Sequence, residues 1–325
     1  MKKTIWILLD NRIGSRHQAE GIANYLDNTK FKIIFKEIEY TRWASLPNII
    51  RGKTLIGITN TSKQQLTSPF PDFVLSATRR TAPVARWIKK QNPTTKLFQL
   101  LHIGKTGIKD FTTVFAPEHD SHKHKASNIH YTIGSPHFVT TEKLAQAREK
   151  WDPIFSSLPH PITAIIIGGS IKKHPFSLQN AENLATQIKQ LKTQDKGSIL
   201  LTTSRRTGAE AEKIIVENLK SIPQYAYLWG ASGENPYLGF LSCADNIIVT
   251  GDSVSMCCEA TAANKPLAIF TGKNWLTPKH LRFVQSLYEQ NYAEPFSSQS
   301  FNTIKKTEKP LNIAQEIAEY LENIE

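Results

Sequence analysis

Residues 246–263 read NIIVTGDSVSMCCEATAA, and this stretch decides the fold. The apolar run at 246–250 is typical of a buried strand, and the segment at 254–263 is typical of a helix. A Thr-Gly-Asp-Ser turn joins the two, and a second apolar run, PLAIF at 266–270, follows the helix. Because a strand, a helix and another strand in this order form the crossover unit of a parallel sheet, the stretch predicts an α/β domain.

The same alternation continues along the chain in both directions. In the first half we predict helices at 15–26 and 82–91, and strands at 4–10, 31–38, 54–59, 72–77, 95–101 and 112–117. In the second half we predict strands at 163–169, 197–203, 225–229, 246–250 and 266–270, and helices near 178–193, 207–220, 236–243, 254–263 and 279–290. The pattern predicts an α/β fold of two Rossmann-like, doubly wound parallel-sheet domains that face each other across a cleft.

A proline-rich stretch marks the predicted boundary between the domains. Residues 151–163, WDPIFSSLPHPIT, contain three prolines within ten residues, and proline favours extended chain over helix. We therefore predict an N-terminal domain at 1–155 and a C-terminal domain at 160–298. Residues 299–325 form a loop and an amphipathic helix, at about 309–324, predicted to pack back on the N-terminal domain.

Composition indicates a globular protein of the cytoplasm. The chain of 325 residues is 40% hydrophobic and 21% charged, and it has no apolar run of the roughly 20 residues that span a bilayer. The apolar start ends at Asp10 without a small-residue cleavage site, so we interpret it as a first strand and not a signal peptide. Three cysteines, Cys243, Cys257 and Cys258, are too few and too clustered for a disulfide framework.

Positive charge is concentrated in the first half. Residues 1–150 hold 24 Lys and Arg against 11 Asp and Glu, whereas residues 151–325 hold 16 against 17. Such asymmetry indicates that the first half meets a polyanion, such as a membrane surface or an anionic glycolipid. A solvated basic surface that aids solubility is the alternative. Nucleic acid is disfavoured as a partner, because aromatic and basic residues do not interleave as in a base-stacking surface.

Two loops of the second half are polar where a predicted strand ends. Gly168, Gly169 and Ser170 follow one strand, and glycines allow the backbone to approach an anion. Thr203, Ser204, Arg205 and Arg206 follow another strand and precede a helix. An ordinary turn and an ordinary helix cap are the alternatives, although paired arginines add positive charge where the helix dipole is already positive.

The turn at 250–253 forms a third such loop. Asp252 or Ser253 is the expected N-cap, and the amides of Ser253, Val254 and Ser255 would face an anion. Ser255 and Glu259 are four residues apart, so they share one helix face about 6 Å apart along the axis. This spacing suits a nucleotide whose phosphate meets the serines and whose ribose meets the carboxylate. Caps and a solvated glutamate are the alternative.

Segment 235–267 resembles the donor-binding part of glycosyltransferases with the GT-B fold. There, a short helix that ends in Ala-Asp precedes a strand, a Ser/Gly-rich helix start and a helical glutamate. More of the chain resembles the family named for a plant mitochondrial-fission (elongated mitochondria) protein, whose bacterial members are regarded as glycosyltransferases of this architecture. The motifs that carry this resemblance lie between about residues 4 and 296: WILLDNRIGSRHQAEGIANYL, PDFVLSATRRTAPVARWIKK, IIIGGS, LLTTSRRTG, GENPYLGFLSCADNIIVTGDSVSMCCEA and RFVQSLYEQNYAEPF.

Two positions depart from the family pattern. Asn264 stands where a glycine is expected before Lys-Pro, and GSR stands where Gly-Asn is frequent. Neither change removes a charged group. Asn264 must then adopt the positive φ that glycine would supply, which asparagine does more readily than most residues.

The resemblance implies a nucleotide-sugar site in the second domain. It assigns the ribose to Glu259 and the base to the surroundings of Trp229, with Asn235 at the start of the short helix. The diphosphate is assigned to Gly169, Ser170, Ser204, Arg205, Ser253 and Ser255.

The first half is expected to bind the acceptor on the opposite wall. Asp10 and His17 are the candidates for the base that activates the acceptor, because each can titrate usefully. Arginines among hydroxyls suit a phosphate or an acidic sugar. The alternatives are a merely polar histidine and a solvated helix start. The acceptor-side residues are Gly14, Ser15, Arg16, Thr78, Arg79 and Arg80.

No metal or cofactor is expected. His119, Asp120, His122, His124 and His130 carry suitable atoms, but their spacings match no zinc signature and lysines lie between them, so a polar loop is the preferred interpretation. The sequence also lacks G-x-G-x-x-G, a Walker loop and G-x-S-x-G, which disfavours a dehydrogenase, a P-loop NTPase and a hydrolase.

Together these features predict a metal-independent glycosyltransferase that moves a sugar from a nucleotide-diphosphate sugar to an anionic acceptor, of the glycolipid or lipopolysaccharide type. We expect a cytoplasmic protein without a transmembrane segment, and peripheral binding at the inner membrane face is a further interpretation. A nucleotide-sugar 2-epimerase is one alternative. A non-catalytic, membrane-associated interaction protein that retains the cleft is another.

Overall fold

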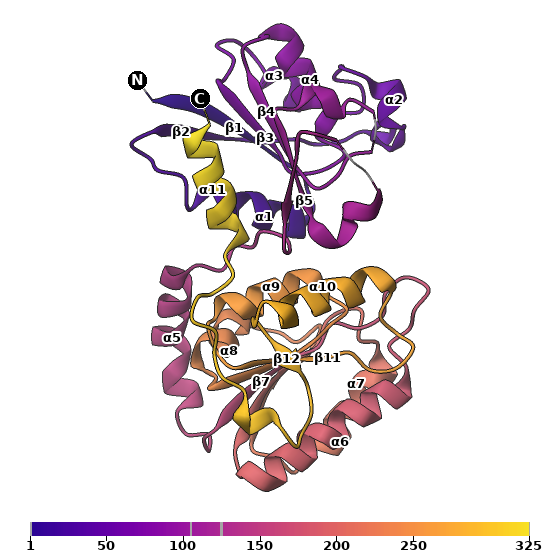
Figure 1. The fold of residues 1–325 in the computed structure, drawn as a ribbon, viewed down its shortest axis with the longest axis vertical. Coiled ribbons are helices and arrows are strands. Elements are labelled where there is room, and N and C mark those ends of the chain that lie inside the picture. The colour runs from indigo at the N-terminus through magenta and orange to yellow at the C-terminus, as the bar shows by residue number, and fades with distance from the viewer. Residues whose placement is uncertain (1, 105, 124–125, 325) are drawn as a thin grey trace. The chain divides into compact units, whose positions relative to one another are not determined.

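The computed structural model describes residues 2–104, 106–123 and 126–324. It divides into two compact units (Figure 1), and each is described by itself. Unit 1 comprises Met1–Phe138 and Asn312–Glu325, and unit 2 comprises Val139–Leu311. Among the described residues, no helix combines the length and the apolar character needed to cross a membrane.

Unit 1 is built on a six-stranded sheet in the order β2-β1-β3-β4-β5-β6, and every neighbouring pair is parallel. The order in which successive strands are added to the sheet reverses between β1 and β3, as in flavodoxin-like sheets. The strands are β1 (Lys3–Leu9), β2 (Phe31–Glu37), β3 (Phe73–Ser76), β4 (Lys96–Leu100), β5 (Thr113–Pro117) and β6 (Ile129–Thr132).

Helices cover both faces of this sheet (Figure 1). One face packs on α4, and the other lies toward α1 and α11, where the ring of Tyr320 contacts that of Phe115 at a centroid distance of 5.3 Å. The helices are α1 (Ile13–Ala23), α2 (Asn48–Arg51), α3 (Asn60–Gln64), α4 (Ala82–Gln91) and α11 (Ile313–Asn323), with 3-10 turns η1 (Arg42–Ser45), η2 (Ile108–Asp110) and η3 (Glu118–Lys123).

Unit 2 is built on a second six-stranded parallel sheet in the order β12-β11-β10-β7-β8-β9. Counted from the first strand of the unit, this is the Rossmann order, and its direction reverses between β7 and β10. The strands are β7 (Ile162–Ile166), β8 (Ser198–Thr202), β9 (Gln224–Tyr227), β10 (Asn246–Thr250), β11 (Leu267–Phe270) and β12 (Glu294–Pro295).

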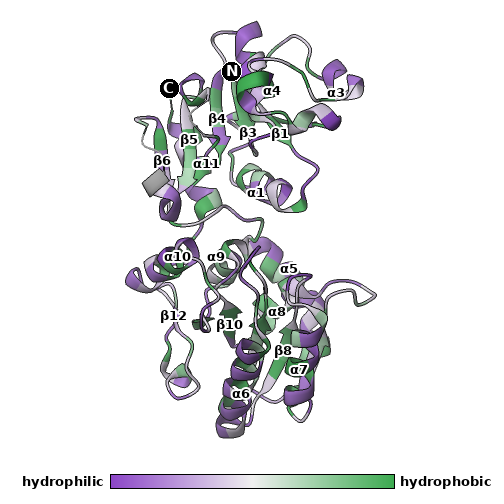
Figure 2. Cartoon of the chain, turned by 90° about the vertical axis from the view of Figure 1, so that its right-hand side faces the viewer, coloured by the Kyte–Doolittle hydropathy of each residue, from purple (hydrophilic) through white to green (hydrophobic). Residues whose placement is uncertain are grey.

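The helices of unit 2 also lie on both faces of its sheet (Figure 1). They are α5 (Thr141–Phe155), α6 (Leu178–Asp195), α7 (Ala209–Leu219), α8 (Tyr237–Cys243), α9 (Val254–Ala262) and α10 (Pro278–Glu289), with the 3-10 turn η4 (Phe301–Thr303). The central strands are apolar and the outer faces of the helices are polar (Figure 2). Burial on both faces explains why strands such as β7, β8 and β11 read as continuous apolar runs without alternation.

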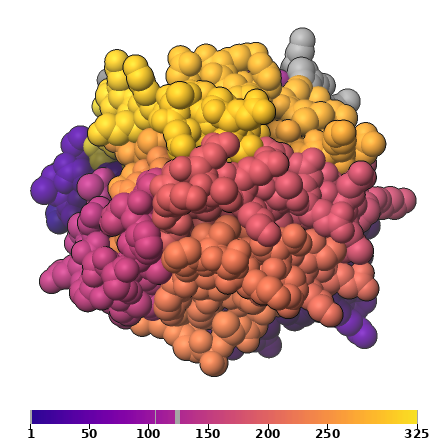
Figure 3. Space-filling view, turned by 90° about the horizontal axis from the view of Figure 1, so that it is seen from below, coloured from indigo at the N-terminus to yellow at the C-terminus, as the bar shows by residue number. Residues whose placement is uncertain are grey.

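The segment that follows β12 packs on α6. Phe296, Phe301 and Ile304 belong to the same buried cluster as the apolar face of α6, and the Ser298 hydroxyl donates to Gln190 Oε1 at 3.1 Å. The space-filling view shows this segment, in yellow, beside α6 (Figure 3). Residues 299–311 therefore belong to unit 2, and only the last helix returns to unit 1.

The boundary between the units lies at Phe138 and Val139 and not in the proline-rich stretch. Residues 151–155 of that stretch complete α5, and β7 begins at Ile162. The helix tolerates Pro153 because its apolar face, with Trp151 and Phe155, is buried against α8. Proline content alone was therefore the wrong guide to the boundary.

One predicted strand, at 54–59, is absent from the described residues. Only an isolated bridge joins Ile58 to Tyr40. Gly57 has φ of +91°, and a Cβ there would lie 2.8 Å from Ala44 Cα, so the chain turns closely against η1. The sequence analysis also missed α2, α3, α5, β6 and β12. The other predicted helices are confirmed to within a few residues, and Asn264 has the expected positive φ, of +50°.

Candidate functional site

The strand-end loops of unit 2 meet at one edge of its sheet. Ile166 of β7 is in register with Thr202 of β8 and Val249 of β10, and Thr250 is in register with Phe270 of β11. The loops that follow these strands therefore start side by side. Doubly wound sheets bind ligands at this edge, where the strand order reverses, which here lies between β7 and β10.

A glycine pair forms the turn after β7. The amide of Gly168 donates to Thr250 Oγ1 at 2.7 Å, and the amide of Gly169 donates to Asp252 Oδ2 at 2.8 Å. The Gly169 carbonyl accepts from the indole of Trp275 at 3.0 Å. A Cβ on Gly168 would lie 2.3 Å from Asp252 Oδ2, and one on Gly169 would lie 2.0 Å from the carbonyl oxygen of Arg206. Only glycine fits both positions.

Asp252 connects three of the loops. Its side chain is buried, and it accepts hydrogen bonds from the Gly169 amide after β7 and from the Thr250 hydroxyl at 2.7 Å. It also forms an ion pair with Arg206 Nη1, after β8, at 2.8 Å. Burial raises the pKa of Asp252 above its ordinary value, while Arg206 and the two hydrogen bonds lower it. Arg206 Nη1 also donates to the Ser170 carbonyl at 3.1 Å. The ion pair therefore fixes the loops to one another.

Two predicted phosphate ligands, Ser170 and Ser204, make hydrogen bonds within this framework. The Ser170 hydroxyl accepts from the Phe176 amide at 3.0 Å, and its amide donates to the Arg206 carbonyl at 2.8 Å. The Ser204 hydroxyl donates to the Gly168 carbonyl and accepts from the Arg206 amide. With the Gly169 amide also bonded to Asp252, these three residues shape the turn. Their predicted direct role toward a diphosphate stays a prediction.

The start of α9 has the groups that the sequence predicted. Ser253 is the N-cap, and its hydroxyl accepts from the Met256 amide at 3.5 Å. Val254 and Ser255 follow as the first helical residues, whose amides have no carbonyl one turn earlier within the helix. The side chain of Ser255 is exposed. This helix start can therefore donate hydrogen bonds to an anion.

Glu259 lies one turn after Ser255 on the same face of α9 and is partly buried. Its Oε2 accepts from the hydroxyl of Tyr237 at 2.7 Å, and within the described part of the chain its Oε1 accepts no hydrogen bond. Burial raises the pKa of Glu259 to about 7, although the Tyr237 bond lowers it. Burial also raises the pKa of Tyr237 well above its ordinary value, so the phenol is the donor. The carboxyl group is thus held in place with one oxygen open.

The remaining predicted donor-site residues are exposed. Arg205 lies at the surface beside the paired Arg206, and no ion pair holds it among residues that the structure describes. Trp229 is 62% exposed, and its amide donates to the Thr203 hydroxyl at 2.8 Å, which fixes its backbone beside the β8 loop. Asn235 Oδ1 accepts from the amide of Tyr237, the first residue of α8, at 3.0 Å. This hydrogen bond fixes the backbone of Tyr237, whose hydroxyl donates to Glu259.

In unit 1, a buried aspartate also follows the strand at the point of reversal. Asp10, after β1, is 1% exposed, and its Oδ2 accepts from the Thr78 hydroxyl, after β3, at 3.0 Å. Its Oδ1 accepts from the Arg12 amide at 3.2 Å and lies 3.9 Å from Arg80 Nη1. Asp10, Thr78 and Arg80 therefore meet as a group, while the side chain of Arg79 is exposed.

The other acceptor-side residues lie on α1, not in a loop, because the helix begins at Ile13. Gly14 is exposed and Ser15 is partly buried in the first turn. Arg16 pairs with Glu37 at 2.9 Å and with Glu20 at 3.5 Å. His17 packs on the ring of Phe138 at a centroid distance of 4.2 Å. The two candidate bases, Asp10 and His17, thus have different surroundings.

The histidine-rich segment at 119–130 is only partly described. His124 lies outside the described residues, and His119 is buried. Further along, His130 Nε2 lies 3.0 Å from Glu316 Oε1 of α11. Among the described residues, no group of three or more His, Cys, Asp or Glu side chains has the geometry to hold a metal ion.

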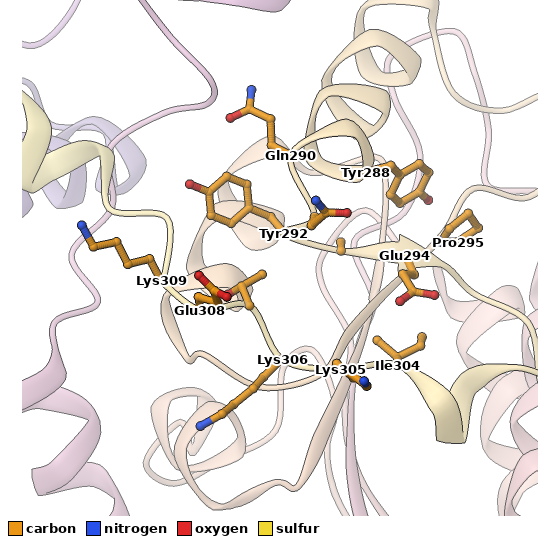
Figure 4. Close-up of a pocket in the computed structure, with 13 residues that line it drawn as sticks. Tyr288, Gln290, Tyr292, Glu294, Pro295, Ile304, Lys305, Lys306, Glu308 and Lys309 are labelled. Carbon is orange, nitrogen blue, oxygen red and sulfur yellow. The ribbon is translucent and has the colours of Figure 1, made fainter.

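A hollow of about 700 Å³ lies at the opposite edge of the second sheet. Its lining residues come from the end of α10, the approach to β12 and residues 304–309 (Figure 4). Thr307 Oγ1 lies 3.4 Å from Asn264 Oδ1, which precedes β11, so this is the amino edge of the strands. In Figure 4 the side chains of Lys306 and Lys309 extend away from the other labelled residues. The hollow is therefore separate from the loops around Asp252, which follow the carboxyl ends of the strands.

Sequence analysis missed four residues that hold the site together: Asp252, Arg206, Tyr237 and Trp275. Asp252 and Arg206 stand in motifs that were singled out, but their neighbours were chosen as ligands. Tyr237 follows Asn-Pro at a helix start, which indicates a local cap and not a link to Glu259 22 residues later. Trp275 follows β11, whose loop was not considered, and an aromatic donor at that edge was the available signal.

Two solved structures of similar fold extend over nearly the whole chain. A glycosyltransferase from Rickettsia africae ESF-5 is 14% identical with a TM-score of 0.53, covering 99% of this chain and 92% of that one. The UDP-GlcNAc 2-epimerase of Methanocaldococcus jannaschii, solved with UDP-GlcNAc and UDP, is 13% identical with a TM-score of 0.52, covering 98% and 99%. At these identities the likeness establishes a shared fold, a GT-B-like fold built from two Rossmann-like α/β units.

Sequence relatives identify the family. An uncharacterized protein of Rickettsia prowazekii (strain Madrid E), RP120, is 29% identical over 347 aligned positions, covering 98% of this chain and 97% of the relative. The family model described as "Mitochondrial fission ELM1" matches residues 13–323. Because that match takes in almost the entire chain, the protein belongs to the mitochondrial fission ELM1 family.

Proposed function

We propose that the protein is a glycosyltransferase that moves a sugar from a nucleotide-diphosphate sugar to an anionic acceptor. The observation that carries the proposal is that Ser255 and Glu259 lie on one face of α9. This helix starts with amides that have no partner within the helix, and it follows the strand at the reversal point of the sheet. Glu259 Oε1 can accept from a ribose hydroxyl while Tyr237 holds Oε2. The helix start and the exposed Arg205 can bind the diphosphate.

This assignment changes how the glycine turn contributes. The polar groups of the turn form hydrogen bonds within the loops, namely those of Gly169, Ser170 and Ser204 with Asp252, Phe176, Arg206 and Gly168. We infer that they set the position of the β8 loop, and hence of Arg205, instead of binding phosphate themselves. Trp229, with its indole exposed beside that loop, is available to stack on the nucleotide base.

The proposed reaction is a direct displacement. The acceptor hydroxyl oxygen bonds to the anomeric carbon, the bond from that carbon to the diphosphate oxygen breaks, and the diphosphate leaves with the electron pair. Helix amides and Arg205 would stabilise the charge that develops on the leaving group, so we expect no metal requirement. The hydroxyl proton passes to a base. Asp10 and His17 stay the two candidates for this base.

We further propose that the acceptor is a glycolipid or lipopolysaccharide intermediate, reached by peripheral binding at the inner face of a membrane in the cytoplasm. The support is the excess of Lys and Arg in the first half of the chain and the arginines beside Asp10. Chelation should leave sugar transfer unchanged, and a loss of activity that only divalent metal restores would contradict metal independence.

The first test is nucleotide binding. Uridine, guanosine, adenosine and cytidine diphosphates are screened by thermal shift, and the best ligand is titrated by calorimetry. Glu259→Gln should weaken binding by about tenfold to a hundredfold, because a hydrogen bond to a charged group contributes about 1.5–3 kcal/mol. Glu182→Gln, at an exposed position on α6, is the matched control and should bind normally. If none of the four diphosphates binds, or if the Glu259→Gln variant binds as well as the wild type, the donor site is rejected.

A nucleotide-sugar 2-epimerase is the second candidate. It is favoured by the fold shared with the Methanocaldococcus jannaschii enzyme, whose structure holds UDP-GlcNAc and UDP. An epimerase consumes its nucleotide sugar without an acceptor. Formation of the 2-epimer in a reaction that contains only enzyme and nucleotide sugar would therefore favour this candidate, whereas turnover that depends on an added acceptor favours transfer.

A non-catalytic, membrane-associated interaction protein is the third candidate. For such a protein, Glu259→Gln would leave the cellular phenotype intact even if a nucleotide still binds. Loss of the phenotype together with loss of nucleotide binding would favour an enzyme.

A further inference from the structure

Unit 1 contains a cationic hollow that the proposed donor site does not use. It has a volume of about 510 Å³ and is lined by Arg12, Arg42, Arg79 and Arg80, together with Thr41, Ala44, Ser45, Leu46, Pro47 and Asn48. The arginines come from three segments: the turn after β1, the 3-10 turn η1 and the loop after β3. No carboxylate is among the lining residues.

The charge in the hollow is largely uncompensated. Within the described parts of the chain, Arg12, Arg42 and Arg79 form no ion pair, and all three are exposed. Arg80 lies 3.9 Å from Asp10, which is itself buried, and its guanidinium stacks 3.8 Å over the ring of Tyr40. Four guanidinium groups around one hollow match a phosphate, which arginine binds with paired hydrogen bonds.

A fifth arginine supports the wall from behind. Arg51 is completely buried, and its Nη1 donates to the Arg80 carbonyl at 3.1 Å while its Nε donates to the Ile56 carbonyl at 3.0 Å. The side-chain Nδ2 of Asn48 donates to the Arg79 carbonyl at 3.0 Å. The loop that presents Arg79 and Arg80 is therefore fixed to α2 and is not a loose surface segment.

Large apolar side chains surround the hollow and face solvent. Trp43 is 52% exposed, Ile49 is 73% exposed, Ile50 is 59% exposed and Ile13 is 73% exposed. Each of Ile13, Trp43 and Ile49 is the chain neighbour of a residue that lines the hollow, and α2, which carries Ile49 and Ile50, lies at the margin of unit 1 (Figure 1). Five of the twelve exposed large apolar residues of the described chain fall in this region, the fifth being Ile56.

We propose that this surface docks on a membrane and holds the phosphate of an anionic lipid headgroup among Arg12, Arg42, Arg79 and Arg80. Trp43, Ile49 and Ile50 would enter the boundary between headgroups and acyl chains, where tryptophan and aliphatic side chains are favoured. A free, soluble phosphate would leave the apolar rim without a partner. The combination of charge and exposed apolar residues therefore favours lipid as the source of the phosphate.

This inference deepens the proposed function. It rests on that function for one point, which is that a lipid-linked acceptor explains why the protein would bind a membrane. Lipid binding needs no donor, so it is measured without nucleotide. Diphosphate binding to unit 2 is measured separately, on the same preparations. Loss of one with retention of the other shows which of the two proposals fails.

The test is co-sedimentation of the full chain with vesicles. Phosphatidylcholine vesicles are compared with vesicles of phosphatidylcholine and phosphatidylglycerol, and binding is expected only to the mixed vesicles. Arg42→Ala with Arg79→Ala should weaken it about 30-fold, because each basic residue near an anionic surface contributes about fivefold. Lys32→Ala with Lys90→Ala removes the same charge from exposed positions of unit 1 outside the hollow and should have a much smaller effect. Trp43→Ser with Ile49→Ser should also weaken binding while the charge is unchanged.

Circular dichroism and the thermal midpoint confirm that the variants fold, which is expected because the changed side chains are exposed. Equal losses in the arginine and lysine pairs would overturn the proposal in favour of diffuse electrostatics. Equal binding to both vesicle types would overturn the phosphate assignment. If the protein binds neither vesicle type but binds glycerol phosphate or inorganic phosphate in calorimetry, the assignment of a lipid as the source of the phosphate would be overturned.

Discussion

At the reversal point of unit 1, Asp10 follows β1 and accepts from Thr78 after β3; at that of unit 2, Asp252 follows β10 and accepts from Gly169 after β7. Each aspartate is buried, and each lies near an arginine of a neighbouring loop. The distance differs, however: Arg206 is 2.8 Å from Asp252, whereas Arg80 is 3.9 Å from Asp10 and stacks on Tyr40.

The difference concerns how the positive charge is used. In unit 2 the arginine neutralises the aspartate, and the loops become a fixed support for the start of α9. In unit 1 the arginines stay available to a ligand. Unit 1 holds 21 Lys and Arg against 13 Asp and Glu, and unit 2 holds 19 against 15, so the excess is larger in unit 1 even with the acidic last helix included.

The largest expected effect tests the tighter of the two ion pairs. Asp252→Ala should destabilise the protein by about 4 kcal/mol, because it leaves Arg206, the Gly169 amide and the Thr250 hydroxyl without their acceptor. Asp10→Ala should cost about 2 kcal/mol, since Arg80 is farther away and stacks on Tyr40. Urea unfolding of both variants measures the two values. If Asp10→Ala costs as much as Asp252→Ala, the comparison between the two pairs fails.

A second comparison uses glycines. Gly169→Ala should cost about 3 kcal/mol, because the new Cβ would lie 2.0 Å from a backbone oxygen in a residue with φ of +141°. Gly14→Ala is the control in unit 1. Its Cβ would have nothing within 4 Å, and the residue is helical, so the change should be neutral or stabilise by up to about 1 kcal/mol. Thermal and urea unfolding check both, and a neutral Gly169→Ala would show that the turn is looser than described.

A third prediction concerns pH. The pKa of Glu259 is raised from its ordinary 4.5 to about 7, so between these values the folded chain holds a proton that the unfolded chain has released. The contribution of Glu259 to the free energy of unfolding therefore falls as pH rises from about 4.5 to about 7. Relative to the wild type, Glu259→Gln should gain up to about 3 kcal/mol across this pH range. Urea unfolding at a series of pH values checks this, and parallel pH profiles for the two proteins would contradict it.

The smallest effect separates two adjacent arginines. Arg206→Ala should destabilise by about 2 kcal/mol because Asp252 loses its cation. Arg205→Ala should change stability by less than about 0.5 kcal/mol, since the residue is exposed and unpaired within the described chain. The same Arg205 variant should weaken diphosphate binding. Calorimetry and unfolding on both variants test this, and the opposite pattern would exchange the two assigned roles.

Local pattern was enough to predict most of the fold. Apolar runs and helical periodicity predicted the sheets, Asn264 was expected to have positive φ, and Ser253 was one of two expected caps of α9. These features depend on neighbours in the chain, so the sequence carries them directly. The four-residue spacing of Ser255 and Glu259 is of the same kind.

The partners of the polar groups could not be predicted in the same way. Gly169 bonds to Asp252 across 83 residues of sequence, and Trp275 bonds to Gly169 across 106. Which of Arg205 and Arg206 turns inward, and whether Ser204 faces a ligand or the Gly168 carbonyl, depends on how these distant loops meet. The Ser170 and Ser204 hydroxyls, which the resemblance assigned to the diphosphate, instead form hydrogen bonds within these loops.

The return of α11 to unit 1 makes unit 2 a domain inserted within another. The side chain of Lys3 donates to the carbonyl of Ile324 at 3.2 Å, so the two ends of the chain lie together, and the chain leaves unit 1 after Phe138 and re-enters it at Asn312. A gene fragment for 139–311 is therefore one continuous cassette, whereas unit 1 alone needs a new joint between 138 and 312. Removing the last helix as a dispensable tail would strip unit 1 of part of its own sheet covering.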